Sequence, residues 1–179
     1  RQLKRWHGQW EKSKTRELPV VEEVHAGLLA AIPPQPRTSI VHGDYRLDNC
    51  LLGPHGDVVA VLDWEICTLG DPLADVGLLM VYWPEPGAEH EVLANAPTTV
   101  EGLPRRADLP DRYAGIDLSG IDYYVAFGYW KLACIIDGVY ARYVGGAMGE
   151  GRNGPEFDVF AQQVEALARA AAAALERTA

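Results

Sequence analysis

Cysteine is scarce in this sequence. Three cysteines occur among 179 residues, and they are widely spaced, with no C-x-x-C pair. An odd number of separated cysteines disfavours a disulfide framework and a cysteine-ligated metal site. Cys50, Cys67 and Cys134 are therefore predicted to be reduced thiols, which are typical of a cytoplasmic protein.

Long hydrophobic runs and an excess of positive charge are also missing. No apolar run approaches the roughly 20 residues that a membrane-spanning helix needs. The stretch from Arg1 to Arg16 is basic but lacks the apolar centre of a signal peptide. The formal net charge of −9 disfavours nucleic acid as a partner, because lysine and arginine are the residues that bind phosphate backbones. We expect no membrane span and no nucleic-acid partner.

What the sequence does contain is an ordinary globular composition. Hydrophobic residues make up 48% of the chain and charged residues 23%. A chain of 179 residues is long enough to bury a core of its own. We expect one domain that covers residues 1–179.

Three oxygen-bearing side chains occur around a predicted β-hairpin. Asp44 lies in a predicted loop directly after a short apolar run, and Asn49 follows five residues later. Residues 51–62 are predicted to form strand, turn and strand, because Pro, Gly and Asp residues lie between β-rich flanks. A turn at the centre of this stretch places Asn49 almost opposite Leu62, one residue from Asp63. The second strand is so apolar that we expect it to be buried, with its end open to a site.

Phosphoryl transfer requires these parts. A carboxylate orients the attacking hydroxyl and accepts its proton, while oxygen ligands hold Mg²⁺ against the phosphates. Mg²⁺ prefers a few protein oxygens and fills its other positions with water or phosphate oxygen. The arrangement predicts Asp44 as the base, and Asn49 and Asp63 as metal ligands. Turn stabilisation by Asp44 or Asn49 and a surface position for Asp63 are the alternatives.

Residues 42–49, His-Gly-Asp-Tyr-Arg-Leu-Asp-Asn, resemble the HGDxxxxN catalytic loop of the aminoglycoside phosphotransferase-like kinases. Residues 63–65, Asp-Trp-Glu, are similar to the metal-binding segment of that family, and residues 69–77 resemble its GDPxxDLA-like continuation. Within this family, the sequences of these motifs are most similar to the branch found beside acyl-CoA dehydrogenases. The resemblance implies an α+β, mainly α chain: the helical C-terminal lobe of a protein-kinase-like fold with a small catalytic-loop β-hairpin.

The resemblance also implies roles for individual residues. Asp44 would be the catalytic base, and Asn49 and Asp63 would bind Mg²⁺ with ATP as the phosphoryl donor. His42 and Asp71 would brace the loop, and Asp75 would cap or anchor the helix after it. Glu65 would either contact a second metal or hold the loop. The supporting positions are His42, Arg46, Glu65, Asp71 and Asp75.

Members of this family clamp ATP with an N-terminal lobe that carries a β-sheet, a phosphate-covering loop and a strand with a lysine. The 38 residues before Ser39 instead read as two helices, Arg1–Lys14 and about Val20–Ile32. They contain neither G-x-G-x-x-G nor G-x-x-x-x-G-K-[ST]. We therefore expect the ATP-clamping lobe to be absent from this chain. A missing N-terminal lobe of the same protein would be its partner, and the chain alone would be a poor catalyst.

Helices are expected over most of the remaining sequence. A short, mostly buried helix is predicted for residues 73–83, after a proline in its first turn. A long helix is predicted for residues 119–144, with Ser119 as its cap and two glycines at its end. An alanine-rich helix is predicted for residues 157–177. Apolar residues at three- and four-residue steps predict that the long helix packs against the other two.

Residues 84–118 are rich in proline, glycine and charge, and are predicted to form a long loop or short helices on the acceptor side. Arg105, Arg106 and Arg112 are candidates to meet an anionic substrate such as a CoA thioester, with plain solvent exposure as the alternative.

Other polar residues are given no role by their spacing. Asp137, inside the long helix, is expected to face water. Four histidines share no metal-ligand spacing and are expected to be incidental: His7, His25, His55 and His90.

The leading hypothesis is an ATP- and Mg²⁺-dependent phosphotransferase that acts on a hydroxyl of a small molecule, present here as its catalytic lobe. A non-catalytic kinase-like interaction or regulatory module is the main alternative, and a Mg²⁺-dependent hydrolase is a weaker one. The acceptor stays open among aminoglycosides, choline-like alcohols, sugars and hydroxyacyl-CoA, because a fold does not specify a substrate.

Overall fold

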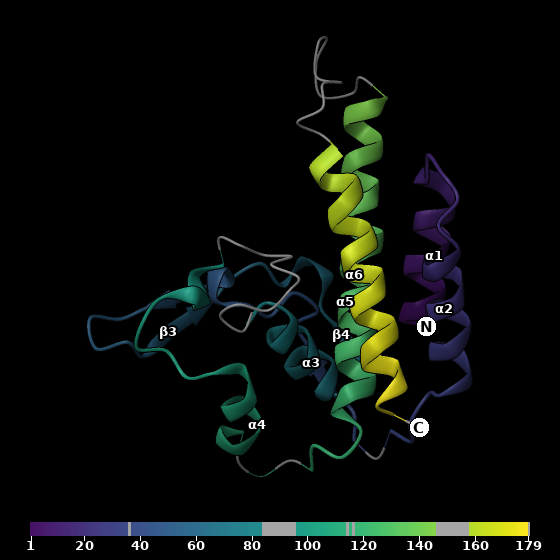
Figure 1. Cartoon of the computed structure of the whole chain (residues 1–179). Helices are drawn as coiled ribbons and strands as arrows, with labels where there is room; N and C mark the ends of the chain where they lie inside the picture. The colour runs from purple at the N-terminus through teal and green to yellow at the C-terminus, as the bar shows by residue number, and fades with distance from the viewer. Residues whose placement is uncertain (36, 84–95, 114, 116, 146–157, 179) are drawn as a thin grey trace. The chain divides into compact units, whose positions relative to one another are not determined.

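The computed structural model describes the whole chain except residues 36, 84–95, 114, 116, 146–157 and 179 (Figure 1). The described residues form two compact units. Unit 1 comprises Arg1–Ile32 and Ala126–Ala179, and unit 2 comprises Pro33–Val125. The architecture is mainly helical with small antiparallel strand pairs, which confirms the predicted mainly α, α+β class. The single domain expected from chain length stays a prediction.

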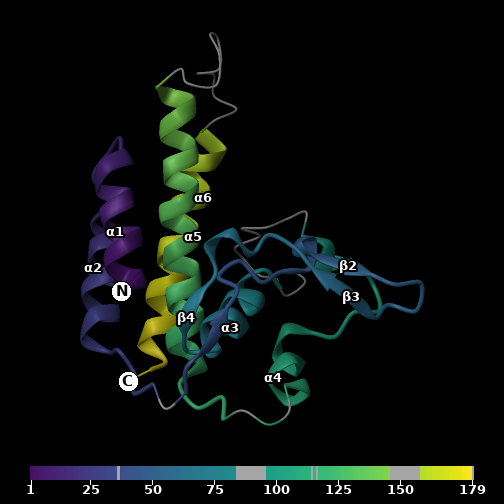
Figure 2. The same ribbon diagram turned by 180° about the vertical axis from the view of Figure 1, so that it is seen from behind.

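Unit 1 is built from helices. It contains α1 (Gln2–Ser13), α2 (Pro19–Ala30), the larger part of α5 (Ile121–Val144) and α6 (Asp158–Glu176). The four predicted helical segments are thus confirmed, with bounds shifted by a few residues. Helices α5 and α6 run next to each other (Figures 1 and 2), and the ring of Tyr143 on α5 stacks on that of Phe160 on α6 with centroids 5.5 Å apart. The predicted packing of the long helix against the final helix is confirmed.

Two tryptophans anchor the core of unit 1. The side chains of Trp10 and Trp130 are fully buried. Trp130 Nε1 donates to the backbone oxygen of Val21 at 3.0 Å, which ties α5 to α2. Trp10 Nε1 donates to Asp137 Oδ2 at 2.9 Å. Asp137 is fully buried, so the expectation that it faces water is wrong. Its partner Trp10 lies 127 residues away along the chain, so the sequence around Asp137 does not reveal this contact.

Unit 2 contains two antiparallel strand pairs. Strand β1 (Ser39–Val41) pairs with β4 (Thr68–Gly70), and β2 (Cys50–Leu52) pairs with β3 (Val58–Val61). The β2–β3 hairpin confirms the predicted strand, turn and strand (Figure 2). Strand β4 was not predicted, because three residues give no clear alternation and its partner is distant in sequence.

The β2–β3 hairpin is not buried. Leu51, Leu52, Val58 and Val59 each keep about half or more of their surface exposed. The expectation of a buried second strand is therefore wrong for the residues that the structure describes. Apolar residues on a strand indicate a surface that becomes buried against a partner. That partner can be another segment or another protein, so the apolar sequence alone does not show that the described residues bury the strand.

Helix α3 (Leu73–Val81) supplies the core of unit 2, with Leu73, Val76, Leu78 and Val81 buried as predicted. Gly77 permits a close approach, because a Cβ atom there would lie 2.5 Å from the backbone carbon of Tyr124 at the start of α5. The predicted contact between the long helix and this short helix is thus confirmed.

The described part of residues 84–118 contains short helices. Helix α4 (Leu109–Arg112) follows a 3₁₀ turn at Arg106–Asp108, and another 3₁₀ turn spans Pro97–Thr99. Residues 84–95 and His90 lie outside the described residues.

Helix α5 begins at Ile121, and the hydroxyl of Ser119 donates to Asp117 Oδ2 at 2.8 Å. The predicted cap by Ser119 stays a prediction. Among the helices that the structure describes, none has the length and apolarity needed to cross a bilayer.

Candidate active site

Two backbone amides of the loop after β1 are held by Asp75. His42 N donates to Asp75 Oδ2 at 2.7 Å, and Gly43 N donates to Oδ1 at 2.8 Å. Gly43 has a φ of 86°, a conformation that favours glycine. A Cβ atom there would also lie 3.2 Å from the backbone oxygen of Ile66. Asp75 therefore fastens the loop to α3.

The roles of Asp71 and Asp75 are the reverse of those expected, since Asp71 was expected to brace the loop and Asp75 to cap or anchor the helix. Asp71 Oδ1 accepts from the backbone N–H of Leu73, the first residue of α3, at 2.9 Å. Asp71 thus supports the helix start, while Asp75 braces the loop. The i to i+2 bond is common for an aspartate before a helix, whereas the loop contact spans more than 30 residues and has no sequence signature.

His42 is buried between the loop and the hairpin. Its Nε2 lies 2.7 Å from the backbone oxygen of Leu62, and its Nδ1 lies 3.2 Å from the backbone N of Asp44. A carbonyl oxygen only accepts and an amide N–H only donates, so both contacts require a neutral ring with its proton on Nε2. With both nitrogens engaged, His42 orients the loop as expected of a bracing residue.

Asn49 holds the side chain of Asp44. Its Nδ2 donates to the backbone oxygen of Asp44 at 2.7 Å and to Asp44 Oδ2 at 3.0 Å. These bonds use the amide nitrogen, so Oδ1 is the atom of Asn49 that can face a cation. Arg46 Nε lies 3.4 Å from the same Oδ2 of Asp44, and Arg46 Nη1 lies 3.3 Å from Asp48 Oδ2. The Asp44 carboxylate is about three-quarters buried and charge-balanced.

The hairpin register brings Asp63 to the same end as Asn49. Cys50 pairs with Val61, and Leu62 N donates to the backbone oxygen of Asn49 at 2.8 Å. The predicted position of Asn49 opposite Leu62 is therefore confirmed. Asp63 follows directly, with an exposed side chain and a left-handed backbone at φ 64° and ψ 52°. Such a backbone is uncommon outside glycine, although aspartate tolerates it better than most residues.

Tyr82, at the end of α3, belongs to this group but carries no signal in the sequence. The guanidinium of Arg46 lies over its ring, 4.9 Å from the centroid. Burial, followed by the nearby carboxylate of Asp44, raises the pKa of Tyr82 to about 12. Thr98 Oγ1 donates to the backbone oxygen of Tyr82 at 2.8 Å. An aromatic residue at the end of the short helix is equally expected for core packing, so the sequence does not distinguish the two roles of Tyr82.

The matching family model is the phosphotransferase enzyme family, APH, and it covers residues 1–109. The chain belongs to this family. Mouse acyl-CoA dehydrogenase family member 10 is 36% identical over 149 residues, which are 79% of this chain and 14% of that protein. Human acyl-CoA dehydrogenase family member 11 is 29% identical over 99% of this chain and 23% of that protein.

A solved structure from Ralstonia eutropha, assigned as an aminoglycoside phosphotransferase, matches this family member with a TM-score of 0.75 and 30% identity. The match covers 98% of this chain and 54% of that one. The chain thus spans about half of its structural relative and less than a quarter of the two acyl-CoA dehydrogenase family relatives.

The remaining predicted residues of this phosphotransferase-family chain lie in or next to two 3₁₀ turns and in the short helix α4. Glu65 is exposed in the 3₁₀ turn Trp64–Ile66. Arg105 binds Asp108 through Nη2 at 3.0 Å and Nε at 3.2 Å, and these bonds lower the pKa of Asp108. Arg106 is half-buried and Arg112 is exposed. Their part in substrate binding stays a prediction.

Proposed function

We propose that this chain is the catalytic lobe of an ATP- and Mg²⁺-dependent phosphotransferase that transfers the γ-phosphoryl group to a hydroxyl of a small molecule. The single observation that carries the proposal is the position of Asn49. It holds the carboxylate of Asp44 and lies at the hairpin end where Asp63 follows. One carboxylate fixed as a base beside two further oxygen donors is the set of protein groups that this reaction uses.

Asp44 is proposed to orient the acceptor hydroxyl and take its proton. Asn49 limits the rotation of the Asp44 side chain, because one amide bonds both its backbone and its carboxylate. Fixed geometry of this kind contributes to catalysis by removing the cost of orienting the base during the reaction. Arg46 lies close enough to balance the charge of Asp44, and Tyr82 supports the Arg46 guanidinium from beneath.

Asn49 and Asp63 fit the ligand preference of Mg²⁺, since they offer an amide oxygen and a carboxylate, both hard donors. The exposed Asp63 side chain leaves room for further ligands. When bound, Mg²⁺ would neutralise phosphate charge that develops during transfer. Asp63 in a left-handed conformation is consistent with a functional constraint at this position, because such backbones cluster at binding sites.

The proposal includes a nucleotide-binding lobe as the partner of this chain. The apolar residues exposed on the β2–β3 hairpin support it, because a cluster of exposed Leu and Val side chains marks an interaction surface. The Ralstonia relative also extends well beyond the part that matches here.

The acceptor is proposed to be a small-molecule alcohol. The names of the two relatives associate this domain with acyl-CoA dehydrogenases, so a hydroxyacyl-CoA is the first acceptor to test. Arg106 and Arg112 are cationic groups that an anionic acceptor of this kind would meet. Aminoglycosides, choline-like alcohols and sugars complete the screen.

The test is ADP release by the full-length protein with ATP, Mg²⁺ and each acceptor. Asp44→Ala is expected to lower turnover by at least about 100-fold, the smaller end of what general-base catalysis contributes. Asp57→Asn, in the exposed hairpin turn, is the matched control and should keep full activity. Binding of ATP and acceptor without turnover would support a non-catalytic module instead. Phosphate release without any acceptor would indicate a hydrolase.

A further inference from the structure

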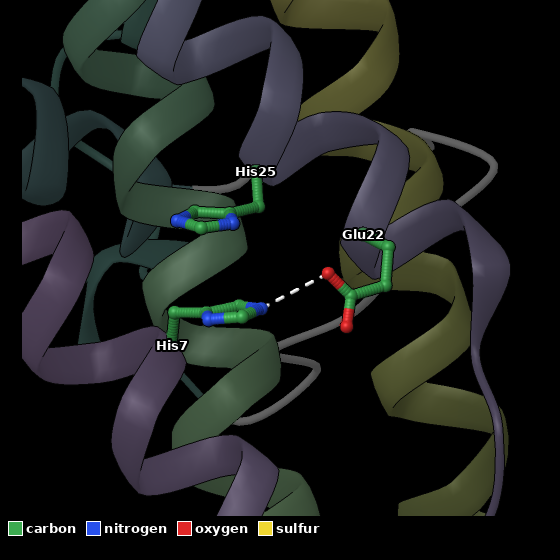
Figure 3. Close-up of side chains that lie close together, drawn as sticks. All are labelled: His7, Glu22 and His25. Carbon is green, nitrogen blue, oxygen red and sulfur yellow. Dashed lines mark hydrogen bonds and ion pairs between the residues drawn. The ribbon is translucent and has the colours of Figure 1, made fainter.

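His7, Glu22 and His25, here called the two-helix cluster, bring three metal-ligand side chains of unit 1 together (Figure 3). His7 lies on α1, whereas Glu22 and His25 lie on α2. Their spacing of three residues places Glu22 and His25 on one face of that helix. One ligand atom of each residue lies within 4.8 Å of the others. Their spacing in the sequence did not predict that His7 and His25 lie together.

The cluster is accessible to an ion. His7 Nε2 lies 2.9 Å from Glu22 Oε2, and the two side chains are 25% and 42% exposed. A cation can thus reach the point where the imidazole and the carboxylate meet without opening the core of unit 1.

His25 is an imidazole without a hydrogen-bond partner for one nitrogen. Its ring stacks on the ring of His7, with centroids 3.9 Å apart and an interplanar angle of 9°. It also stacks against Trp130 at 5.3 Å. Its Nε2 is buried, and no residue that the structure describes hydrogen-bonds to it. Buried polar atoms are nearly always paired, so an unpaired nitrogen in a histidine cluster points to a missing ligand.

The charge state of His25 suits a metal ligand. Burial, with the neighbouring His7 as a second cause, lowers the pKa of His25 below its ordinary value. A neutral imidazole is the form that binds metals, because a protonated ring has no lone pair to offer.

We propose that His7, Glu22 and His25 bind one transition-metal dication, Zn²⁺ in the first instance, with water completing the coordination. Two imidazole nitrogens and one carboxylate oxygen are a known zinc donor set, with a fourth position open to solvent. A hard ion such as Mg²⁺ prefers oxygen donors and is not expected to compete. The bound ion would tie α1 to α2, since it takes one ligand from the first helix and two from the second.

Binding requires a side-chain adjustment. Zinc binds imidazole nitrogen at about 2.0–2.1 Å, in the plane of the ring. Two rings stacked face to face do not aim their lone pairs at one point, so at least one ring must rotate out of the stack. The surface position of His7 leaves it free to make this rotation. The NMR shifts of both rings should therefore change when Zn²⁺ is added.

The experiment is a Zn²⁺ titration of the full-length protein after removal of metal with a chelator, followed by calorimetry and metal analysis. We expect a saturable site that a large excess of Mg²⁺ leaves unchanged. His25→Gln and His7→Gln should each weaken it by at least about 10-fold, as even the loss of an outer partner does at many metal sites. Using variants on two different helices guards against a local folding defect in one of them.

Controls separate this site from other zinc ligands. Glu23→Gln, at an exposed position next to the cluster on α2, should bind Zn²⁺ like the wild type. Cys67→Ser should do so as well, because Cys67 lies in unit 2. The proposal is overturned if the wild type shows no saturable binding, or if His7→Gln and His25→Gln bind Zn²⁺ with the affinity of the wild type. The readout is binding, so its failure is distinguishable from failure of the phosphotransferase assay.

Discussion

The amide of Asn49 bonds both the backbone oxygen and the carboxylate of Asp44, at 2.7 and 3.0 Å. The two residues are five positions apart, and the bonds close the loop on itself. Asn49 thus has two tasks in the proposed reaction, because its nitrogen positions the base while its oxygen remains for the metal. A substitution of Asn49 therefore tests both the positioning of the base and the binding of the metal.

Asn49→Ala is expected to lower kcat/KM for the acceptor by about 100-fold, the loss typical when a catalytic group is misplaced by about 1 Å. The Asp44 carboxylate then loses the amide that limits its rotation, and one proposed metal ligand is gone. The measurement is ADP release against Mg²⁺ concentration, with Asp57→Asn as the matched control. Full activity of Asn49→Ala at the Mg²⁺ concentration used for the wild type would contradict both tasks.

His42→Ala should destabilise unit 2 by about 1–3 kcal/mol, because it leaves the Leu62 oxygen and the Asp44 amide without their buried partner. Urea unfolding measures the change. His55→Ala, in the exposed turn of the hairpin, should change stability by less than about 0.5 kcal/mol. Equal stability of the two variants would show that the His42 contacts do not hold the loop.

Gly77→Ala and Gly8→Ala form a matched pair with opposite expected signs. A Cβ atom at Gly77 would lie 2.5 Å from the Tyr124 backbone, so α3 and α5 must move apart within unit 2, at a cost of about 1–3 kcal/mol. A Cβ atom at Gly8 in α1 meets nothing within 4 Å, and alanine there should stabilise by about 0.5–1 kcal/mol. Thermal unfolding of both variants checks the signs. A neutral Gly77→Ala would mean that the close approach is absent.

Asp137 is expected to make unit 1 less stable as the pH rises. Burial raises its pKa above the ordinary 3.8, while the bond from Trp10 and the charge of Arg16 act in the other direction. The folded state then holds the proton to a higher pH than the unfolded state does. The stabilisation is present below pH 3.8 and is lost as the pH rises through the folded pKa.

Asp137→Asn, which cannot lose a proton, should flatten this part of the profile of unfolding free energy against pH. Glu176→Gln, at the exposed end of α6, should leave the profile unchanged. Parallel profiles for the wild type and Asp137→Asn would rule out a raised pKa for Asp137.

His25 is expected to have the opposite pH dependence to Asp137. Its folded pKa lies below 6.5, so the unfolded state takes up a proton first as the pH falls. The free energy of unfolding should therefore drop as the pH falls below 6.5, and the loss should be complete below the folded pKa.

His25→Gln should remove this slope in metal-free protein, as measured by denaturant unfolding between pH 8 and pH 5. His55→Gln is the control, since its side chain is exposed. A slope that persists in His25→Gln would assign the titration to another group.

The hairpin illustrates what local sequence can predict. Turn residues between two apolar segments predict the register, and the register puts Asn49 opposite Leu62 and next to Asp63. The helices followed from their periodicity, and their bounds agree within a few residues. These features depend on contacts between residues close in sequence, where spacing and stereochemistry leave few alternatives.

Contacts between segments that are distant in the sequence could not be predicted from local patterns. The exchange of contacts between Asp71 and Asp75 depends on where the loop meets α3. The burial of Asp137 depends on a tryptophan at the other end of the chain. An aspartate inside an amphipathic helix has the same sequence environment whether its face meets water or an indole N–H.

The sequence by itself determined the family motifs, the order of the helices and the hairpin that brings Asn49 and Asp63 to the same end, because each is specified by residues a few positions apart. Only the tertiary structure decided that His42 has both nitrogens engaged, that Tyr82 lies beneath Arg46, and that His7 meets Glu22 and His25. Those contacts join separate elements, and their geometry is set by how the cores pack, for which no local pattern carries a signal.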